Sequence, residues 1–142
     1  MAPSLIEKVN TLINASLHGM VDRALSQNSV AVMDEYIRQA EKNLEALEDS
    51  AATVGGTVRT LKRKYDEFAA AAEKLDRDID TLVLKGKNDL AAAAQAELNT
   101  KQQLAQEYFE QWQTQDQQYN AMLDMRMKLE ARLTTIRQER EQ

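Results

Sequence analysis

The side chains that could carry out chemistry are few and form no recognisable catalytic or metal-binding pattern. His18 is the only histidine and cysteine is absent, which excludes multi-histidine and thiolate metal sites. The 23 Asp and Glu residues are spread along the chain, as on solvated helix faces with i,i+4 ion pairs, an interpretation simpler than acid–base catalysis. No glycine-rich phosphate loop is present. The sequence therefore predicts a protein that is not an enzyme, with no catalytic residue, no metal and no cofactor.

One dense group of basic residues stands out, the stretch RTLKRK with Arg59, Lys62, Arg63 and Lys64. The whole chain has 18 Lys and Arg residues against 23 Asp and Glu residues, a formal net charge of −5. Nucleic-acid binding usually needs a dominant basic face, so we expect no nucleic-acid partner. The basic stretch is either a solvated patch or a surface that pairs with acidic neighbours in an assembly.

The composition indicates that helices position all of these residues. With 29% charged and 5% aromatic residues, four glycines and one proline, the chain is rich in helix formers and poor in turn residues. It contains no run of about 18 apolar residues, the length that would cross a bilayer. The lack of cysteine fits a reducing compartment. We expect an all-α, soluble, cytoplasmic protein.

Apolar residues from Val30 to Leu82 recur at alternating spacings of three and four, which is the pattern of a coiled-coil seam. The stretch KGKN at 85–88 then provides a helix-ending glycine, Gly86, and a cap, Asn88, for the next helix. Folding the chain back at this turn places Leu44 opposite Leu129 and Leu61 opposite Trp112. The fold class predicted is all-α: a long antiparallel coiled-coil hairpin preceded by a short amphipathic helix.

The hairpin is expected over residues 26–142, with arms at about 29–84 and 88–142 and a turn at 85–88. Polar residues interrupt the second arm's stripe at Lys101, Gln115 and Arg126, and Lys62 is expected near Glu110. Gly55 and Gly56 are assigned outside the seam, where they would permit a bend. The principal seam residues predicted are Leu44, Leu61, Tyr65, Phe68, Leu75, Leu98, Tyr108, Trp112 and Leu129.

Residues 1–25 form a separate predicted unit, because the seam register fails when it is extended backward. Ser4 and Glu7 fit a capping box that starts one helix over residues 4–25, and apolar residues cover about half of its circumference. No face of the hairpin is left unmatched to receive this helix. Two interpretations stay open: it folds back on the hairpin or packs in an oligomer, or it lies in a membrane interface. Its cations Lys8 and Arg23 are offset by Glu7 and Asp22, which favours apolar insertion over electrostatic attraction.

The stretches YIRQAEKNLEAL and LVLKGKNDLAAAAQAEL, with the preceding amphipathic helix, resemble the phage shock protein A family. This family includes the vesicle-inducing protein in plastids and belongs to the ESCRT-III superfamily. The resemblance implies a cytoplasmic homo-oligomer, peripheral at the inner face of a membrane, that remodels or protects the bilayer in a stress response. Its partners would be membrane lipids, expected to be anionic. The membrane-binding residues implied are Leu5, Ile6, Lys8, Val9, Leu12, Ile13, Leu17 and Met20.

In some members of that family the hairpin also binds and inhibits an AAA+ transcription activator. The alternative function implied is therefore a regulatory adaptor whose partner is such an activator. Where the family usually opens the first arm with Asp-Pro, this chain has Asn28-Ser29. Asn28 is expected to cap the start of that arm.

Overall fold

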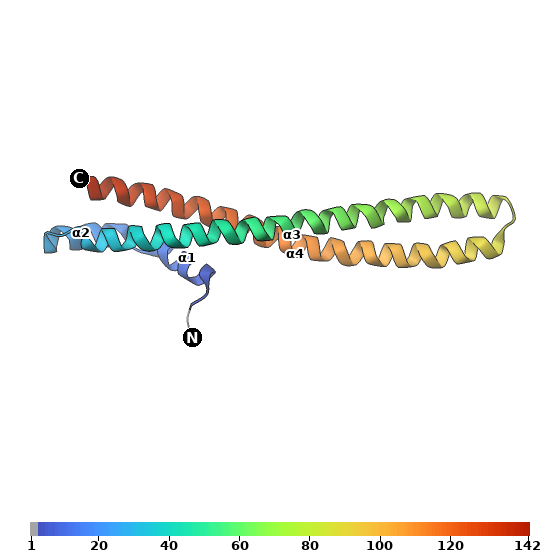
Figure 1. Ribbon diagram of the computed structural model, residues 1–142, viewed down its shortest axis with the longest axis horizontal. Coiled ribbons are helices and arrows are strands. Elements are labelled where there is room, and N and C mark those ends of the chain that lie inside the picture. Colours follow the sequence, from blue (N-terminus) through green and yellow to red (C-terminus); the bar gives the residue numbers. More distant parts are fainter. Residues whose placement is uncertain (1–2) are drawn as a thin grey trace. The chain divides into compact units, whose positions relative to one another are not determined.

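The computed structural model describes residues 3–142, and within this range it is helical with no strand (Figure 1). The four helices of the described range are α1 Leu5–Asn14, α2 Leu17–Gln27, α3 Ala31–Leu84 and α4 Asn88–Glu141. Helices α3 and α4 pack against each other in opposite directions. The predicted all-α helical hairpin is therefore confirmed.

The contacts divide the chain into two compact units, each of which contains part of α3 and part of α4. Unit 1 consists of the residues up to Thr53 together with Tyr119–Gln142, and unit 2 is Val54–Gln118. Helix α3 is continuous through Gly55 and Gly56, near the start of unit 2. Gly55 is buried, although the sequence reading placed it outside the seam.

In unit 1, aliphatic side chains from α3 and α4 fill the space between the two helices. Leu47 of α3 and Leu129, Leu133 and Ile136 of α4 are almost completely shielded from solvent. Burying a side chain of this size contributes about 1.5–3 kcal/mol, so these four residues contribute substantially to the stability of this unit. Leu44, predicted for the seam, is half-buried beside them.

Ion pairs between α3 and α4 border this apolar core. Glu48 pairs with Arg126 at 3.4 Å, Glu41 with Arg137 at 2.7 Å and Asp34 with Arg140 at 2.6 Å. The hydrogen bond from Arg140 to Asp34 raises the pKa of Arg140 further above its already high value. These pairs are exposed, so each adds little stability. Arg126, which interrupts the apolar stripe in the sequence, is used here as a partner of Glu48.

In unit 2, aromatic rings take the place of the aliphatic core. The rings of Phe68 and Tyr108 stack with their centroids 5.6 Å apart, and Tyr65 contacts Phe109 at 5.4 Å. Phe109 also contacts Trp112 at 5.8 Å, although the sequence reading did not include Phe109 in the seam. These separations are typical of favourable ring pairs. Among the other predicted seam residues of this unit, Leu98 is buried and Leu61 and Leu75 are half-buried.

Two lysines of unit 2 lie over aromatic rings. The Nζ atom of Lys101 is 5.5 Å from the centroid of the Phe68 ring, which explains how a lysine fits in the apolar stripe. Lys62 lies over Trp112 at 5.4 Å and pairs with Asp66 of its own helix at 3.0 Å. The ion-pair partner of Lys62 is therefore Asp66, and the expectation that Lys62 lies near Glu110 stays a prediction.

Gly86 ends α3 in the left-handed conformation, with a φ angle of +73°. Its N–H donates to the carbonyl oxygen of Val83, and the N–H of Lys87 donates to that of Leu82. This bond pattern satisfies the last carbonyl groups of a helix. Helix α4 then begins at Asn88, and the carbonyl of Lys87 accepts its first hydrogen bond, from Ala91. Asn88, expected to be the cap, is instead the first residue of the helix.

Replacing Gly86 and Gly56 by alanine is expected to change the stability of the hairpin in opposite directions. No atom lies within 4 Å of the Cβ that Gly86→Ala would add, so the cost is conformational, about 1–2 kcal/mol for a left-handed alanine. In Gly56→Ala the nearest atom is 3.9 Å away, so alanine gains about 0.5–1 kcal/mol in the helix interior. Urea unfolding of both variants measures these changes, and midpoints that move together would contradict this account of the turn.

Candidate functional site: the N-terminal helix pair

The first helix of the candidate site begins where the sequence places a cap. The Ser4 side chain accepts a hydrogen bond from the N–H of Glu7 at 3.2 Å, which is the serine half of the predicted capping box. Helix α1 continues to Asn14, and the Thr11 hydroxyl donates to the carbonyl oxygen of Glu7. At ten residues α1 is shorter than the length at which helices are stable alone in water. It therefore depends on a surface to pack against.

The single helix predicted over residues 4–25 is instead two helices, α1 and α2. Ala15 and Ser16 have extended backbone conformations, and the Ser16 side chain accepts a hydrogen bond from the N–H of Gly19 at 3.0 Å. Serine caps a helix start more readily than it continues a helix, because its hydroxyl competes for nearby backbone groups. This cap ends the apolar stripe of α1 and starts a new helix at Leu17.

Asn28 ends α2 rather than opening α3. Its φ angle is +50°, its N–H donates to the carbonyl of Leu25, and the N–H of Ser29 donates to that of Ala24. Asparagine tolerates this left-handed conformation better than most residues. The Ser29 side chain accepts from the N–H of Ala31 and so takes part in the start of α3. The expectation that Asn28 caps the first arm was wrong.

Helix α1 is docked on the hairpin within unit 1. The Tyr36 hydroxyl of α3 donates to the carbonyl oxygen of Leu12 at 2.7 Å, and the Nε of Arg132 in α4 donates to the same oxygen at 3.2 Å. The Nη2 of Arg132 donates to the carbonyl oxygen of Ala15. The last carbonyl groups of a helix lack partners within the helix and carry partial negative charge. A hydroxyl and a guanidinium are therefore well matched to the carboxyl end of α1.

The expectation that the N-terminal helix has no partner in the hairpin was wrong, and the fold-back interpretation describes this structure. Val9 is completely buried and Met20 is 5% exposed, whereas Ile6 is 36% exposed. The eight predicted membrane-binding residues are divided by the break: Leu5, Ile6, Lys8, Val9, Leu12 and Ile13 belong to α1, and Leu17 and Met20 belong to α2. Lys8 is exposed and Leu5, Leu12, Ile13 and Leu17 are half-buried.

Of the motif residues that carried the family resemblance, Tyr36 contacts this docked helix. Tyr36 holds the carbonyl of Leu12, and Glu41 pairs with Arg137. Arg38 pairs with Glu35 at 2.6 Å. Hydrogen bonds from Arg38 and Gln39 lower the pKa of Glu35 to about 2, so any stability that its ionised form adds is lost only as pH falls through that value. The α3 start therefore keeps its carboxylate charge in all ordinary buffers.

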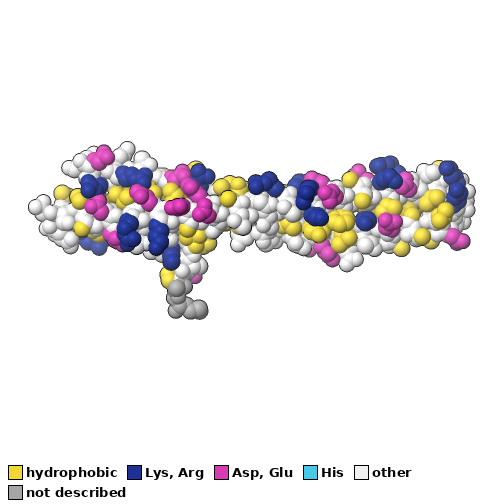
Figure 2. All heavy atoms as spheres, in the orientation of Figure 1, with side chains coloured by type: hydrophobic (Ala, Val, Ile, Leu, Met, Phe, Trp, Pro, Cys, Tyr) yellow, Lys and Arg dark blue, Asp and Glu magenta, His cyan; other side chains and the backbone are white. Residues whose placement is uncertain are grey.

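Charge on the face of the molecule that Figure 2 shows is mixed rather than all basic. In the view of Figure 2, acidic and basic side chains alternate along α3 and α4. On α2, His18 is highly exposed and lies 3.4 Å from Asp22. Such a surface attracts anionic lipid weakly, because the acidic groups offset the basic ones.

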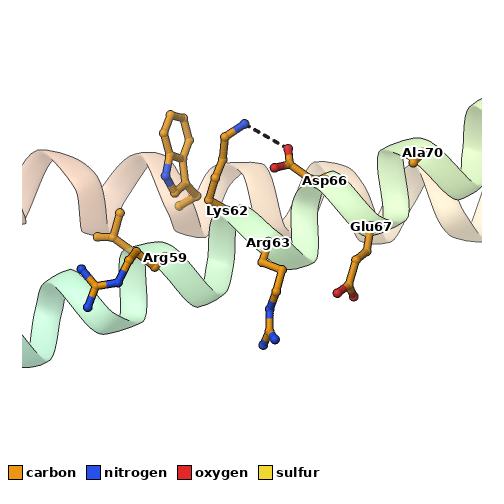
Figure 3. Close-up of a pocket in the computed structure, with 8 residues that line it drawn as sticks. Arg59, Lys62, Arg63, Asp66, Glu67 and Ala70 are labelled. Carbon is orange, nitrogen blue, oxygen red and sulfur yellow. Dashed lines mark hydrogen bonds and ion pairs between the residues drawn. The ribbon is translucent and has the colours of Figure 1, made fainter.

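Unit 2 has an open groove of about 630 Å³ that is bordered by the basic stretch (Figure 3). Val58, Ala70 and Trp112 contribute apolar surface to it, and Arg59 and Arg63 contribute positive charge. Figure 3 shows Lys62 pointing to Asp66 on one side and Arg63 extending away on the other. Within residues 3–142, no carboxylate lies within ion-pair distance of Arg59 or Arg63.

Over residues 3–142, no helix combines the length and the apolar character needed to cross a bilayer. Across the same residues, His, Asp and Glu side chains form no cluster of three or more that could hold a metal ion.

Comparison with known proteins rests on one match. The family model described as the PspA/IM30 family matches residues 4–142, which is nearly the whole chain. Neither the curated proteins nor the solved structures yield a significant match. The matched range includes the N-terminal helix pair and both arms of the hairpin. The chain therefore belongs to the PspA/IM30 family.

Proposed function

We propose that this chain is a membrane-associated, self-assembling scaffold that binds the cytoplasmic face of a bilayer and remodels or protects it. Membership of the PspA/IM30 family supports a membrane-associated scaffold in general. In the proposed mechanism the N-terminal helix inserts its apolar face between lipid headgroups, and the hairpins associate into a homo-oligomer. Apolar insertion, rather than a transmembrane span, would hold the protein at the membrane.

The observation that supports this proposal is the apolar face of α1, part of which is exposed. Leu5, Ile6, Val9, Leu12 and Ile13 form one apolar face on a helix too short to be stable alone, and Ile6 is already 36% exposed. Lys8 is the only cation of this helix. The energy of binding would therefore come mainly from burial of apolar area, at about 25 cal/mol per Å².

Flotation with lipid vesicles tests the proposal. Ile6→Glu places a charge on the inserting face without touching a buried position, and we expect it to weaken vesicle binding at least about tenfold. Thr11→Glu adds the same charge on the exposed polar side of α1 and serves as the matched control, with little expected change. Added salt is expected to have little effect, and binding of neutral vesicles should persist.

Two outcomes would contradict this mechanism. Vesicle binding that is unchanged in Ile6→Glu and in a chain lacking α1 would show that another surface contacts the lipid. Binding that disappears in moderate salt would show that charge, and not insertion, holds the protein on the vesicle.

A second candidate function is a regulatory adaptor that binds and inhibits an AAA+ transcription activator. The open groove of unit 2 favours it, because Arg59 and Arg63 border apolar surface there, beside Asp66, which pairs with Lys62, and Glu67. An acidic partner would contact the two arginines. This function requires no lipid. A chain that binds neither anionic nor neutral vesicles in the flotation experiment would favour the adaptor over the scaffold.

A further inference from the structure

We propose that Tyr36 and Arg132 form an autoinhibitory latch, which keeps the inserting face of α1 on the hairpin until a bilayer competes for it. This inference rests on the proposed function and adds its regulation. It assigns to α1 two alternative surfaces, the hairpin of its own chain and the lipid. The latch sets how strongly the first surface is preferred.

Helix α1 cannot bind the hairpin and the lipid at the same time, because the same apolar side chains would contact either one. Val9 lies in the middle of the apolar face of α1 and is completely buried, and Met20 of α2 is 5% exposed. Neither side chain reaches lipid while α1 stays docked. Insertion of the whole face therefore requires that α1 leaves the hairpin, and a bilayer binds only the undocked state fully.

The hydrogen bonds of the latch are made to the carboxyl end of α1. There they supply the positive charge that the last turn of this helix does not have. Helix α1 has no basic residue in its last turn to balance the partial negative charge of its carbonyl groups. Arg132 supplies that positive charge from α4, with its Nε on Leu12 and its Nη2 on Ala15. Tyr36 donates from α3 to the same Leu12 oxygen, so α1 is tied to both arms of the hairpin.

The Arg132 guanidinium also contacts the break between α1 and α2, at the carbonyl oxygen of Ala15. The carbonyl of Ala15 is available to it because Ala15 is extended and outside both helices. In one unbroken helix that carbonyl would accept a bond from within the helix. The bond from Arg132 to Ala15 that holds α1 on the hairpin therefore depends on the break. Insertion into a bilayer does not depend on this bond, so it does not require the break.

A stronger latch lowers the apparent affinity of the chain for membranes. When the binding-competent state is a minor one, the apparent affinity falls by the fraction of chains in that state. Weakening the docked state raises this fraction, so it tightens vesicle binding without any change in the lipid contacts. An ordinary structural contact would have the opposite effect, because its loss damages the protein that binds.

Two variants and one matched control test the latch. Tyr36→Phe removes only the hydroxyl, and Arg132→Gln removes the guanidinium. Arg137→Gln makes the same charge change on the same helix, but the partner of Arg137 is Glu41 of α3. We expect vesicle binding to tighten roughly three- to tenfold in Tyr36→Phe and about tenfold or more in Arg132→Gln. Arg137→Gln is expected to bind as the unchanged chain does.

Hydrogen exchange without lipid gives a second readout. The amides of α1 are expected to exchange faster in both latch variants and at the original rate in Arg137→Gln, while the core of α3 and α4 stays protected. Circular dichroism reports whether each variant keeps its helical content. If Arg132→Gln loses its fold, Tyr36→Phe still decides the question, because its ring is retained.

The outcomes separate the latch from the proposed function. Faster exchange in α1 without tighter vesicle binding would overturn the latch, as would unchanged exchange in both variants. If Ile6→Glu still abolishes binding in that case, the membrane function stands and only its regulation is wrong. If Ile6→Glu, Tyr36→Phe and Arg132→Gln all leave vesicle binding unchanged, both the latch and the proposed insertion mechanism are wrong.

Discussion

Leu129→Ala is expected to lower the free energy of unfolding of unit 1 by about 2–5 kcal/mol. Leu129 is completely buried between the helices of this unit, so its loss removes apolar contacts and leaves a cavity. The long helices are held in register by the neighbouring buried side chains Leu47, Leu133 and Ile136, which limits how far they close on the space. The loss of unfolding free energy should therefore exceed the free energy of transferring the lost atoms from water to the protein interior.

Urea unfolding followed by circular dichroism measures this effect. Met127→Ala is the matched control, since Met127 lies two residues away on the same helix and is 63% exposed. Its replacement is expected to change the stability by less than about 0.5 kcal/mol. Equal losses in the two variants would mean that the seam of unit 1 does not lie where the structure places it.

Phe109→Ala is expected to lower the stability of unit 2 by about 2–3 kcal/mol. Phe109 is half-buried, so its cost falls below the usual range for a fully buried ring, yet it contacts both Tyr65 and Trp112. Because these rings replace the aliphatic core of unit 1, removing the central ring disrupts several contacts together. Helix α4 itself should persist, because alanine is a good helix former.

Trp112 is the only tryptophan of the chain, so its fluorescence reports on unit 2 alone. Phe109→Leu is the control that keeps most of the volume and loses only the ring contacts, for which we expect a loss of about 1 kcal/mol. An alanine variant that unfolds at the same urea concentration as the leucine variant would show that ring packing, and not volume, decides the stability here.

The hairpin was predictable because its cause is a repeating property of the sequence. Apolar spacings of three and four over both long segments allow few folds other than two helices that share a seam, and Gly86 marks the turn. The same pattern, read as two positions per heptad, missed Phe109. The ring of Phe109 is large enough to contact Tyr65 from a position beside the seam. A pattern that considers only seam positions does not predict this contact.

The docking of α1 was not predictable in the same way. Its polar contacts are made by the carbonyl groups of Leu12 and Ala15, and every residue has a carbonyl group whatever its type. Arg132 and Tyr36 are also separated from them in the sequence by many residues. The break before Leu17 did leave a signal, the serine at position 16, but the continuous apolar stripe outweighed it in the sequence reading.

The turn at Gly86 also sets the order in which contacts close during folding. Contacts near the turn, such as Phe68 with Tyr108, close short loops, whereas Asp34 and Arg140 are 106 positions apart. The hydrogen bond from Arg132 to Leu12 joins residues 120 positions apart. Loop closure costs more entropy as the loop grows, so the hairpin zips from its turn towards its open end. Helix α1 meets α3 early on this path, because the bond from Tyr36 to Leu12 joins residues only 24 positions apart. Its bond to Arg132 of α4 forms only when the open end of the hairpin has closed.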